Sequence, residues 1–309
     1  MSERTDPLVS ILIPARNHER FVQRCLDSVL EDAYPAKELV IIDDGSVDGT
    51  PARIASWVER HRNALPITFL KRENRGVAAT LNELASLARG EFLRLGASDD
   101  YLLPGGTEKL VRYLQSHPWK SAVIGDSVVV DRYDNRLYAS GMCELHGAEK
   151  HVYATDQGIR RAVISRWAIG GPVTLLRRHV PAQVAGWTED LRIDDWDFFL
   201  RLVARDALGF ADVPVCAYRL HDANQSKTRH LATRIAHLKE SQGVAERRLA
   251  LFDGADRQLL QAQAHYIAAK IAYLGREPVS LGAHLLAYAA LRGMSAMRRL
   301  ALSPVATRA

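Results

Sequence analysis

The acidic side chains that could do chemistry come in adjacent pairs at three points of the sequence: Asp43-Asp44, Asp99-Asp100 and Asp194-Asp195. Two neighbouring carboxylates repel each other unless a positive group lies beside them. A hard divalent cation such as Mg²⁺ or Mn²⁺ suits oxygen ligands and a diphosphate. The pair Asp99-Asp100 therefore predicts a site for Mg²⁺ or Mn²⁺.

The pair Asp43-Asp44 lies in the segment Asp43-Asp-Gly-Ser46 at the end of an apolar run. A carboxylate at the end of a strand can accept hydrogen bonds from a nucleotide base or a ribose hydroxyl. Further along, Asn74-Arg-Gly76 begins a helix pattern, where a glycine allows close approach of the backbone to a phosphate or sugar. The alternative for both segments is a set of turn and helix-cap residues, because Asp, Asn, Gly and Ser favour such positions.

The pair Asp194-Asp195 leads into the apolar run Phe198-Phe-Leu-Arg-Leu-Val203. The helix dipole stabilises an ionised carboxylate at a helix N-terminus. Such a group suits a general base that works near neutral pH. The alternative is that these acids only favour the start of the helix.

A basic and an imidazole side chain follow one another in Tyr218-Arg-Leu-His221. Arg219 is predicted to bind a diphosphate, which a guanidinium recognises well. His221 is a candidate to complete the metal site or to hydrogen-bond a phosphate, with a structural role as the alternative.

These motifs need a framework, and the first hundred residues predict one by alternating strand and helix patterns. The strands are expected at Leu8–Ile13, Glu38–Asp43, Ile67–Lys71 and Phe92–Leu95, with helices at 21–30, 50–61 and 76–88. This order predicts a mostly parallel α/β sheet with helices on both faces. Ligands bind such sheets beyond the carboxyl ends of the strands, where residues 14–17, 43–46 and 98–100 all fall.

The second half of the chain is less regular. It predicts a β run at 121–140 with a turn at 133–135, strands near 173–177 and 211–220, and a mostly helical pattern beyond Asn224. We therefore expect a catalytic domain at 1–222 and a helical region at 223–309. From Ala223 onward there are 13 Lys and Arg against 5 Asp and Glu, a net charge of +8 that points to an anionic partner.

Composition, cysteine spacing and the length of the apolar stretches bear on the expected location of the protein. The 309 residues hold 25% charged side chains and three scattered cysteines, without the spacing of a metal or disulfide framework. Residues 281–291 form the longest uncharged apolar stretch, shorter than the roughly 20 residues that span a bilayer. No secretory signal is recognisable, so a cytoplasmic location is expected.

Two other α/β functions are excluded by missing glycines. A dinucleotide oxidoreductase needs G-x-G-x-x-G after the first strand, and this turn reads Pro14-Ala-Arg-Asn17. No G-x-x-x-x-G-K-[ST] phosphate loop occurs either. Nucleic acid is not expected as a partner, because the basic tail carries no recognised binding motif.

Taken in order, the motifs resemble those of the family 2 glycosyltransferases of bacteria over about Leu8–Ser226. The matching segments are Ile13–Asn17, Asp43–Gly49, Glu73–Gly76, Ala97–Asp100, Asp194–Asp197 and Tyr218–His221. The resemblance implies a GT-A fold, inverting chemistry and a nucleoside-diphosphate (NDP) sugar as donor. It also implies an acceptor in a cell-envelope polysaccharide or O-antigen, as a glycan or a lipid-linked molecule.

The resemblance also implies roles for individual residues. Asp100 would be the metal ligand within the family's D-x-D region, with His221 as a further candidate. Asp195 would be the catalytic base, although Asp194 replaces the glutamate of the family's E-D motif and stays an alternative. The residues implied for the donor nucleotide are Pro14, Ala15, Asn17, Asp43, Asp44, Asn74, Gly76, Ser98 and Asp99.

The alternative to a glycosyltransferase is a catalytically inactive sugar-nucleotide-binding or scaffold protein on the same fold.

The role of the tail is a separate question. Its segment Leu281–Leu302 joins an apolar half to a basic end. It is expected to form an interfacial helix on the cytoplasmic membrane face, or to pack against the core or a second subunit.

Overall fold

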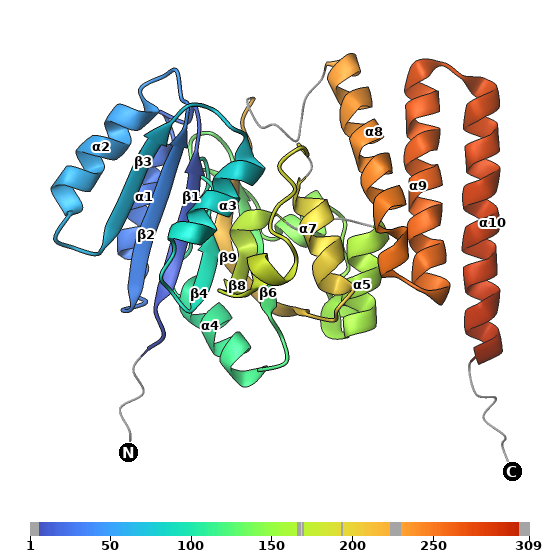
Figure 1. Cartoon of the computed structure of the whole chain (residues 1–309), viewed down its shortest axis with the longest axis horizontal. Helices are drawn as coiled ribbons and strands as arrows, with labels where there is room; N and C mark the ends of the chain where they lie inside the picture. The colour runs from blue at the N-terminus through green and yellow to red at the C-terminus, as the bar shows by residue number, and fades with distance from the viewer. Residues whose placement is uncertain (1–5, 166–167, 169, 193, 223–229, 303–309) are drawn as a thin grey trace, which may run out of the picture.

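The computed structural model describes residues 6–165, 168, 170–192, 194–222 and 230–302 (Figure 1). The first part alternates strands and helices, as predicted. In chain order these are β1 (Val9–Ala15), α1 (Val22–Glu31), β2 (Lys37–Asp44), α2 (Thr50–His61), β3 (Ile67–Arg72), α3 (Val77–Leu87) and β4 (Phe92–Leu95).

The middle of the chain adds shorter and more varied elements. They are β5 (Tyr101–Leu102), α4 (Gly106–Ser116), β6 (Ala122–Val130), β7 (Arg136–Tyr138), α5 (Asp156–Ser165), β8 (Thr174–Arg177), α6 (Val180–Gln183), α7 (Asp194–Val203) and β9 (Leu208–Arg219). Short helical turns lie between them at Gly141–Leu145, Lys150–Ala154 and Gly171–Val173. The predicted β run at 121–140 is thus two strands separated by the turn at 131–135.

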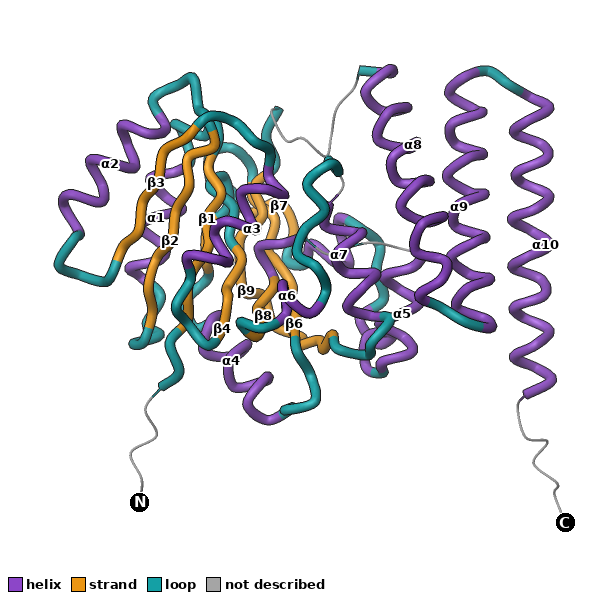
Figure 2. The backbone as a smooth tube through the Cα atoms, viewed as in Figure 1, coloured by secondary structure: helices purple, strands orange, loops and turns teal. Residues whose placement is uncertain are grey.

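The strands of the described residues join one sheet in the order β3-β2-β1-β4-β8-β6-β9-β5, with β7 added beside β6. The pairs β3-β2, β2-β1, β1-β4 and β6-β9 are parallel, whereas β8 is antiparallel to both neighbours. Figure 2 shows α3 in front of the sheet and α1 behind it. The pairs β5-β9 and β6-β7 are also antiparallel, but most of the paired residues belong to the parallel pairs. The predicted α/β class is confirmed. The carboxyl ends of β1, β2 and β4 meet at one edge.

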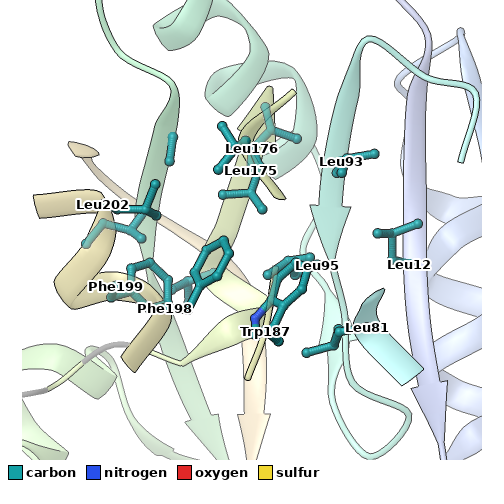
Figure 3. Packing of buried hydrophobic residues seen from close by; sticks show 14 of the residues in the cluster. Leu12, Leu81, Leu93, Leu95, Leu175, Leu176, Trp187, Phe198, Phe199 and Leu202 are labelled. Carbon is teal, nitrogen blue, oxygen red and sulfur yellow. The ribbon is translucent and has the colours of Figure 1, made fainter. Parts of the chain in front are cut away.

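The core is continuous from β1 to α7. Figure 3 shows Trp187 between the leucines of the sheet and Phe198 of α7. The Trp187 and Phe198 rings stack with centroids 4.4 Å apart, and both side chains are buried. Burying one such side chain stabilises the fold by roughly 1.5–3 kcal/mol. This packing fixes the position of α7, and therefore of the acidic segment at its start.

The last quarter of the described chain is helical. It consists of α8 (Leu231–Arg248), a short turn at Leu249–Leu251, α9 (Gly254–Gly275) and α10 (Pro278–Leu302). The three long helices stand side by side, with α10 outermost (Figure 1). Asp256 of α9 forms ion pairs with Arg160 and Arg161 of α5, which ties the helices to the sheet domain. Among the described helices, none combines the length and apolarity needed to cross a bilayer.

Candidate active site

The loops after β1 and β2 are joined to each other. The backbone N–H of Asn17 donates to Ser46 Oγ over 2.9 Å, and Asn17 Oδ1 accepts from the N–H of Val47 over 2.8 Å. Asn17 has a positive φ of 54°, a conformation that asparagine tolerates better than most residues. Pro14 and Ala15 lie beside Ile42 and Asp43 in the strand register. These predicted donor residues therefore lie together at one edge of the sheet.

The carboxylates of Asp43 and Asp44 are both buried and already bonded. Asp43 accepts from the backbone and hydroxyl of Ser46. Asp44 accepts from Arg72 over 2.5 Å and from the N–H groups of Arg75 and Gly76 over 2.8 and 2.9 Å. Asp44 thereby fixes the loop before α3.

The loop before α3 leaves open space beside Gly76. Gly76 has a φ of +90°, and a Cβ there would meet no atom within 4 Å. Asn74 also accepts from the Gly76 N–H, over 3.2 Å. Because the surface at Gly76 is free of neighbours, a ligand can approach this backbone closely, as the sequence suggested.

A candidate metal site lies just past β4, where Asp99 meets two imidazoles. His221 Nε2 lies 3.1 Å and His18 Nε2 3.7 Å from Asp99 Oδ2. One ligand atom from each of the three residues lies within 4.8 Å of the others. Carboxylate oxygen suits Mg²⁺ and Mn²⁺, whereas imidazole nitrogen suits ions such as Zn²⁺, Fe²⁺ and Ni²⁺, so this donor set fits a divalent metal ion. Ser98, a predicted donor residue, orients His18 through a 2.8 Å contact with Nδ1.

Electrostatics favours the ligand forms of Asp99 and His18. Burial opposes ionisation of Asp99, but the His221 hydrogen bond and the nearby His18 hold its pKa below the usual range. Burial also lowers the pKa of His18, which keeps its imidazole neutral at pH 7. Metal ligation needs an ionised carboxylate and a neutral imidazole. His18 was missed in the sequence analysis, although its position directly after Asn17, in a strand-end loop, was a usable signal.

Asp100 is not part of the cluster of Asp99, His18 and His221. Its carboxylate is 3% exposed and accepts from the backbone N–H of Arg219 over 2.8 Å. Burial, and then the charge of Asp99, raise the pKa of Asp100 well above its usual range. The structure therefore places Asp99, not the predicted Asp100, beside the imidazoles.

The predicted diphosphate ligand, Arg219, is also turned into the protein. Its guanidinium pairs with Asp134 over 2.7 Å, donates to the carbonyl of Asp99 over 2.8 Å, and stacks 4.9 Å from the centre of the Phe21 ring. Only 1% of Arg219 is exposed. In this conformation it supports the loop of Asp99 and presents no open surface to a phosphate.

A cavity of about 310 Å³ opens beside His18 and His221. Its lining also includes two basic side chains, Arg20 and Arg132. Arg132 is paired with Asp222 over 2.6 Å, yet its side chain remains 39% exposed. The lining also holds the carboxylates of Glu19, Asp48 and Asp222, so the cavity presents both charges next to the candidate metal site.

The predicted base, Asp195, lies in the first turn of α7. It accepts a hydrogen bond from the backbone N–H of Gly171. A Cβ on Gly171 would lie 3.8 Å from Asp195 Oδ1 and 4.0 Å from Leu95 Cδ1, so the carboxylate and the last residue of β4 are both neighbours of Gly171. Burial raises the pKa of Asp195 to about 6, against the opposing effect of the Gly171 bond. Asp194 begins the helix, but its side chain lies outside the described residues.

Comparison with solved structures identifies the fold. A Staphylococcus aureus protein, TarS, solved with UDP-GlcNAc, has a TM-score of 0.62 at 16% identity, covering 86% of this chain and 81% of that one. A mannosyltransferase of Pyrobaculum calidifontis, solved with GDP-Man and Mn²⁺, has a TM-score of 0.61 at 23% identity, covering 97% and 82%. The chain therefore has the GT-A fold of these enzymes.

Sequence comparison gives the family. An uncharacterized protein of Mycobacterium tuberculosis is 30% identical over 74% of this chain and 72% of its own length. Chondroitin synthase of Escherichia coli is 37% identical over 47% of this chain, which spans only 21% of that enzyme. The model of glycosyl transferase family 2 matches residues 10–169. The chain therefore belongs to glycosyl transferase family 2, as the order of its motifs predicted.

Proposed function

We propose that this protein is an inverting glycosyltransferase that moves a sugar from an NDP-sugar to an acceptor hydroxyl. The proposal is carried by two groups near the end of β4. Asp99 follows that strand and lies with His18 and His221, which follow β1 and β9. Gly171, which donates to the Asp195 carboxylate, also lies beside Leu95, the last residue of β4. These contacts support a site for the diphosphate leaving group and a base near the same edge of the sheet.

In the proposed reaction, Asp195 takes the proton of the acceptor hydroxyl while its oxygen attacks the anomeric carbon. The bond from that carbon to the diphosphate breaks, and the NDP leaves with the electron pair. Attack from the face opposite the leaving group inverts the centre. A Mg²⁺ or Mn²⁺ ion held by Asp99, His18 and His221 would stabilise the charge that develops on the diphosphate.

Donor recognition is assigned to the linked loops at the ends of β1 and β2. Pro14, Ala15 and Asn17 would form the wall of the nucleotide pocket, with Asp43 and Asp44 fixing the loops behind it. Asn74 and Gly76 would border the sugar or phosphate. We assign the diphosphate to Arg20 and Arg132, which line the cavity, in place of the buried Arg219.

A thermal-stability screen tests the proposed donor class. UDP-, GDP- and dTDP-sugars with Mn²⁺ should be compared, since the donors named with the two solved structures differ in nucleotide. A donor at 100 times its dissociation constant should stabilise the protein by roughly 2.7 kcal/mol. If every donor leaves the melting temperature unchanged, with and without Mn²⁺, the proposal fails.

The competing function is that of a catalytically inactive NDP-sugar-binding or scaffold protein. Such a protein would show the same melting shift but would release no NDP. Release of NDP on incubation with the stabilising donor, with water or an added acceptor, therefore separates the two functions.

The proposed acceptor is a glycan or lipid-linked molecule of a cell-envelope polysaccharide or O-antigen. Relatives that include a chondroitin synthase support a role in polysaccharide synthesis. A lipid-linked acceptor would place the enzyme at the cytoplasmic face of the membrane.

The helix α10 is the part of the protein we propose for membrane docking. Its inner face, including Leu281 and Tyr288, packs towards α9, whereas Val279 and Leu286 are 86% and 74% exposed. From Pro278 to the last residue the sequence contains four arginines and no acidic residue. Apolar side chains followed in the sequence by arginines, with no acidic residue among them, match an anionic lipid surface better than a second copy carrying the same charges.

Sedimentation with vesicles checks this docking. We expect the protein to pellet with anionic phosphatidylglycerol vesicles at low salt, less at high salt, and little with neutral vesicles, because each basic residue contributes about 1 kcal/mol near an anionic surface. The double substitution Val279→Ser, Leu286→Ser should weaken pelleting, and Leu231→Ser on α8 is the matched control. If neither form pellets and the double variant instead splits a dimer, α10 is a subunit interface.

A further inference from the structure

The helical C-terminal region contacts the segment that carries Asp195 at two points, both from the same helix. Before the acid, the backbone N–H of Arg192 donates to the Glu240 carboxylate of α8 over 2.6 Å. After it, Arg248 at the end of α8 donates to both oxygens of Asp197, over 2.6 and 3.0 Å. Eight residues of helix separate Glu240 from Arg248, a rise of about 12 Å. The two contacts therefore bracket Asp195.

The second contact is a buried ionic network. Asp197 is 0% exposed and also accepts from Thr188 Oγ1 and from Arg201 Nη2, each over 2.8 Å. Arg248 itself keeps a quarter of its side chain exposed. The network joins α8 and α7 to the loop before α7.

Stability alone is a weak reason for such a network. Desolvation of a buried ion pair consumes much of its Coulombic gain, and apolar residues of similar size often stabilise a fold equally well. A two-point guanidinium–carboxylate bond does, however, fix distance and angle, because both groups are planar. A general base needs such fixing, since a displacement of about 1 Å can lower a rate about 100-fold.

We propose that Arg248 is a positioning residue for Asp195. By holding Asp197, it fixes the first turn of α7 and keeps the Asp195 carboxylate at the carboxyl end of β4. The C-terminal helices are in this way part of the active site and not a separate appendage. The inference rests on the proposed function, in which Asp195 is the base.

The experiment compares full-length Arg248→Met, Arg248→Lys and Arg247→Met. Arg247 is the neighbouring arginine of α8 and is exposed, which makes it the matched control. The rate of NDP release from UDP-GlcNAc or GDP-mannose with Mn²⁺, whichever stabilises the parent, is measured per folded molecule below the melting temperature. We expect kcat to fall about 10- to 100-fold in Arg248→Met, with the donor KM changed less than twofold. Arg248→Lys should recover part of kcat, and Arg247→Met should match the parent.

The pH profile separates positioning from a loss of folded protein. If α7 shifts and Asp195 meets more water, the acidic limb of the kcat profile should move to lower pH in Arg248→Met. A smaller folded fraction would lower kcat without moving that limb. If folded Arg248→Met and Arg248→Lys both keep kcat within threefold of the parent, or lose it without moving the limb, the positioning role is overturned.

Asp195→Asn, run in parallel, tests the base itself. If that variant releases NDP at the rate of the parent, Asp195 is not the base, and the proposed role of Asp195 fails whatever Arg248 does.

Discussion

Asp195→Asn is expected to lose glycosyl transfer by at least ~100-fold while keeping donor binding, because a positioned base contributes about 10²–10⁴-fold. The amide keeps the shape of the side chain and can still meet the Gly171 N–H through its oxygen, but it cannot take a proton. Transfer is measured as NDP released, and donor binding as the melting shift. Since an ionised carboxylate is costly to bury, the variant should melt no lower than the parent.

The same residue sets the expected pH dependence. Burial raises the pKa of Asp195 to about 6, and only the deprotonated form can act as a base. The value of kcat/KM should therefore be constant above that pKa and fall about tenfold per pH unit below it. Asp194→Asn is the neighbouring control. If it abolishes transfer while Asp195→Asn keeps it, the base is Asp194, and if neither matters the mechanism is wrong.

The fold could be predicted from the sequence because its signals are local. Each buried strand before the site is a short apolar run that ends in polar residues, and the helices between have helical spacing. The order of strand and helix then leaves few topologies. The second half was less predictable, since β8 inserts between β4 and β6, a pairing between segments far apart in the chain.

The site was predictable in its segments but not in the direction of each side chain. Asp99 and Asp100 are adjacent, yet one meets two imidazoles and the other accepts from a backbone N–H. Arg219 resembles a phosphate ligand in sequence, but Asp134 and an aromatic ring hold its guanidinium inside. Such outcomes depend on the rotation of loops and on partners more than 80 residues away, which no local pattern reports.

The contrast between the two adjacent carboxylates leads to the second large effect. Asp99→Ala is expected to weaken Mn²⁺-dependent donor binding at least tenfold, because even the outer partners of metal ligands typically contribute 10- to 100-fold to metal affinity. Its carboxylate would be the anionic ligand among His18, Asp99 and His221. Binding is measured as the melting shift with the stabilising donor, with Mn²⁺ and with EDTA. EDTA should reduce the parent protein to the level of the variant.

Asp100→Asn is the matched control, because it keeps the side-chain oxygen that accepts from the Arg219 N–H. Burial favours the neutral form of Asp100. Replacing its carboxyl group with a neutral amide should therefore leave Mn²⁺-dependent binding close to that of the parent. If instead Asp100→Asn abolishes that binding and Asp99→Ala keeps it, the ligand is Asp100 and the loop must rotate when the metal binds.

If the parent binds donor equally well in EDTA, the site works without a metal. The charge on the diphosphate would then have to be met by basic groups such as Arg20 and Arg132, which line the adjoining cavity.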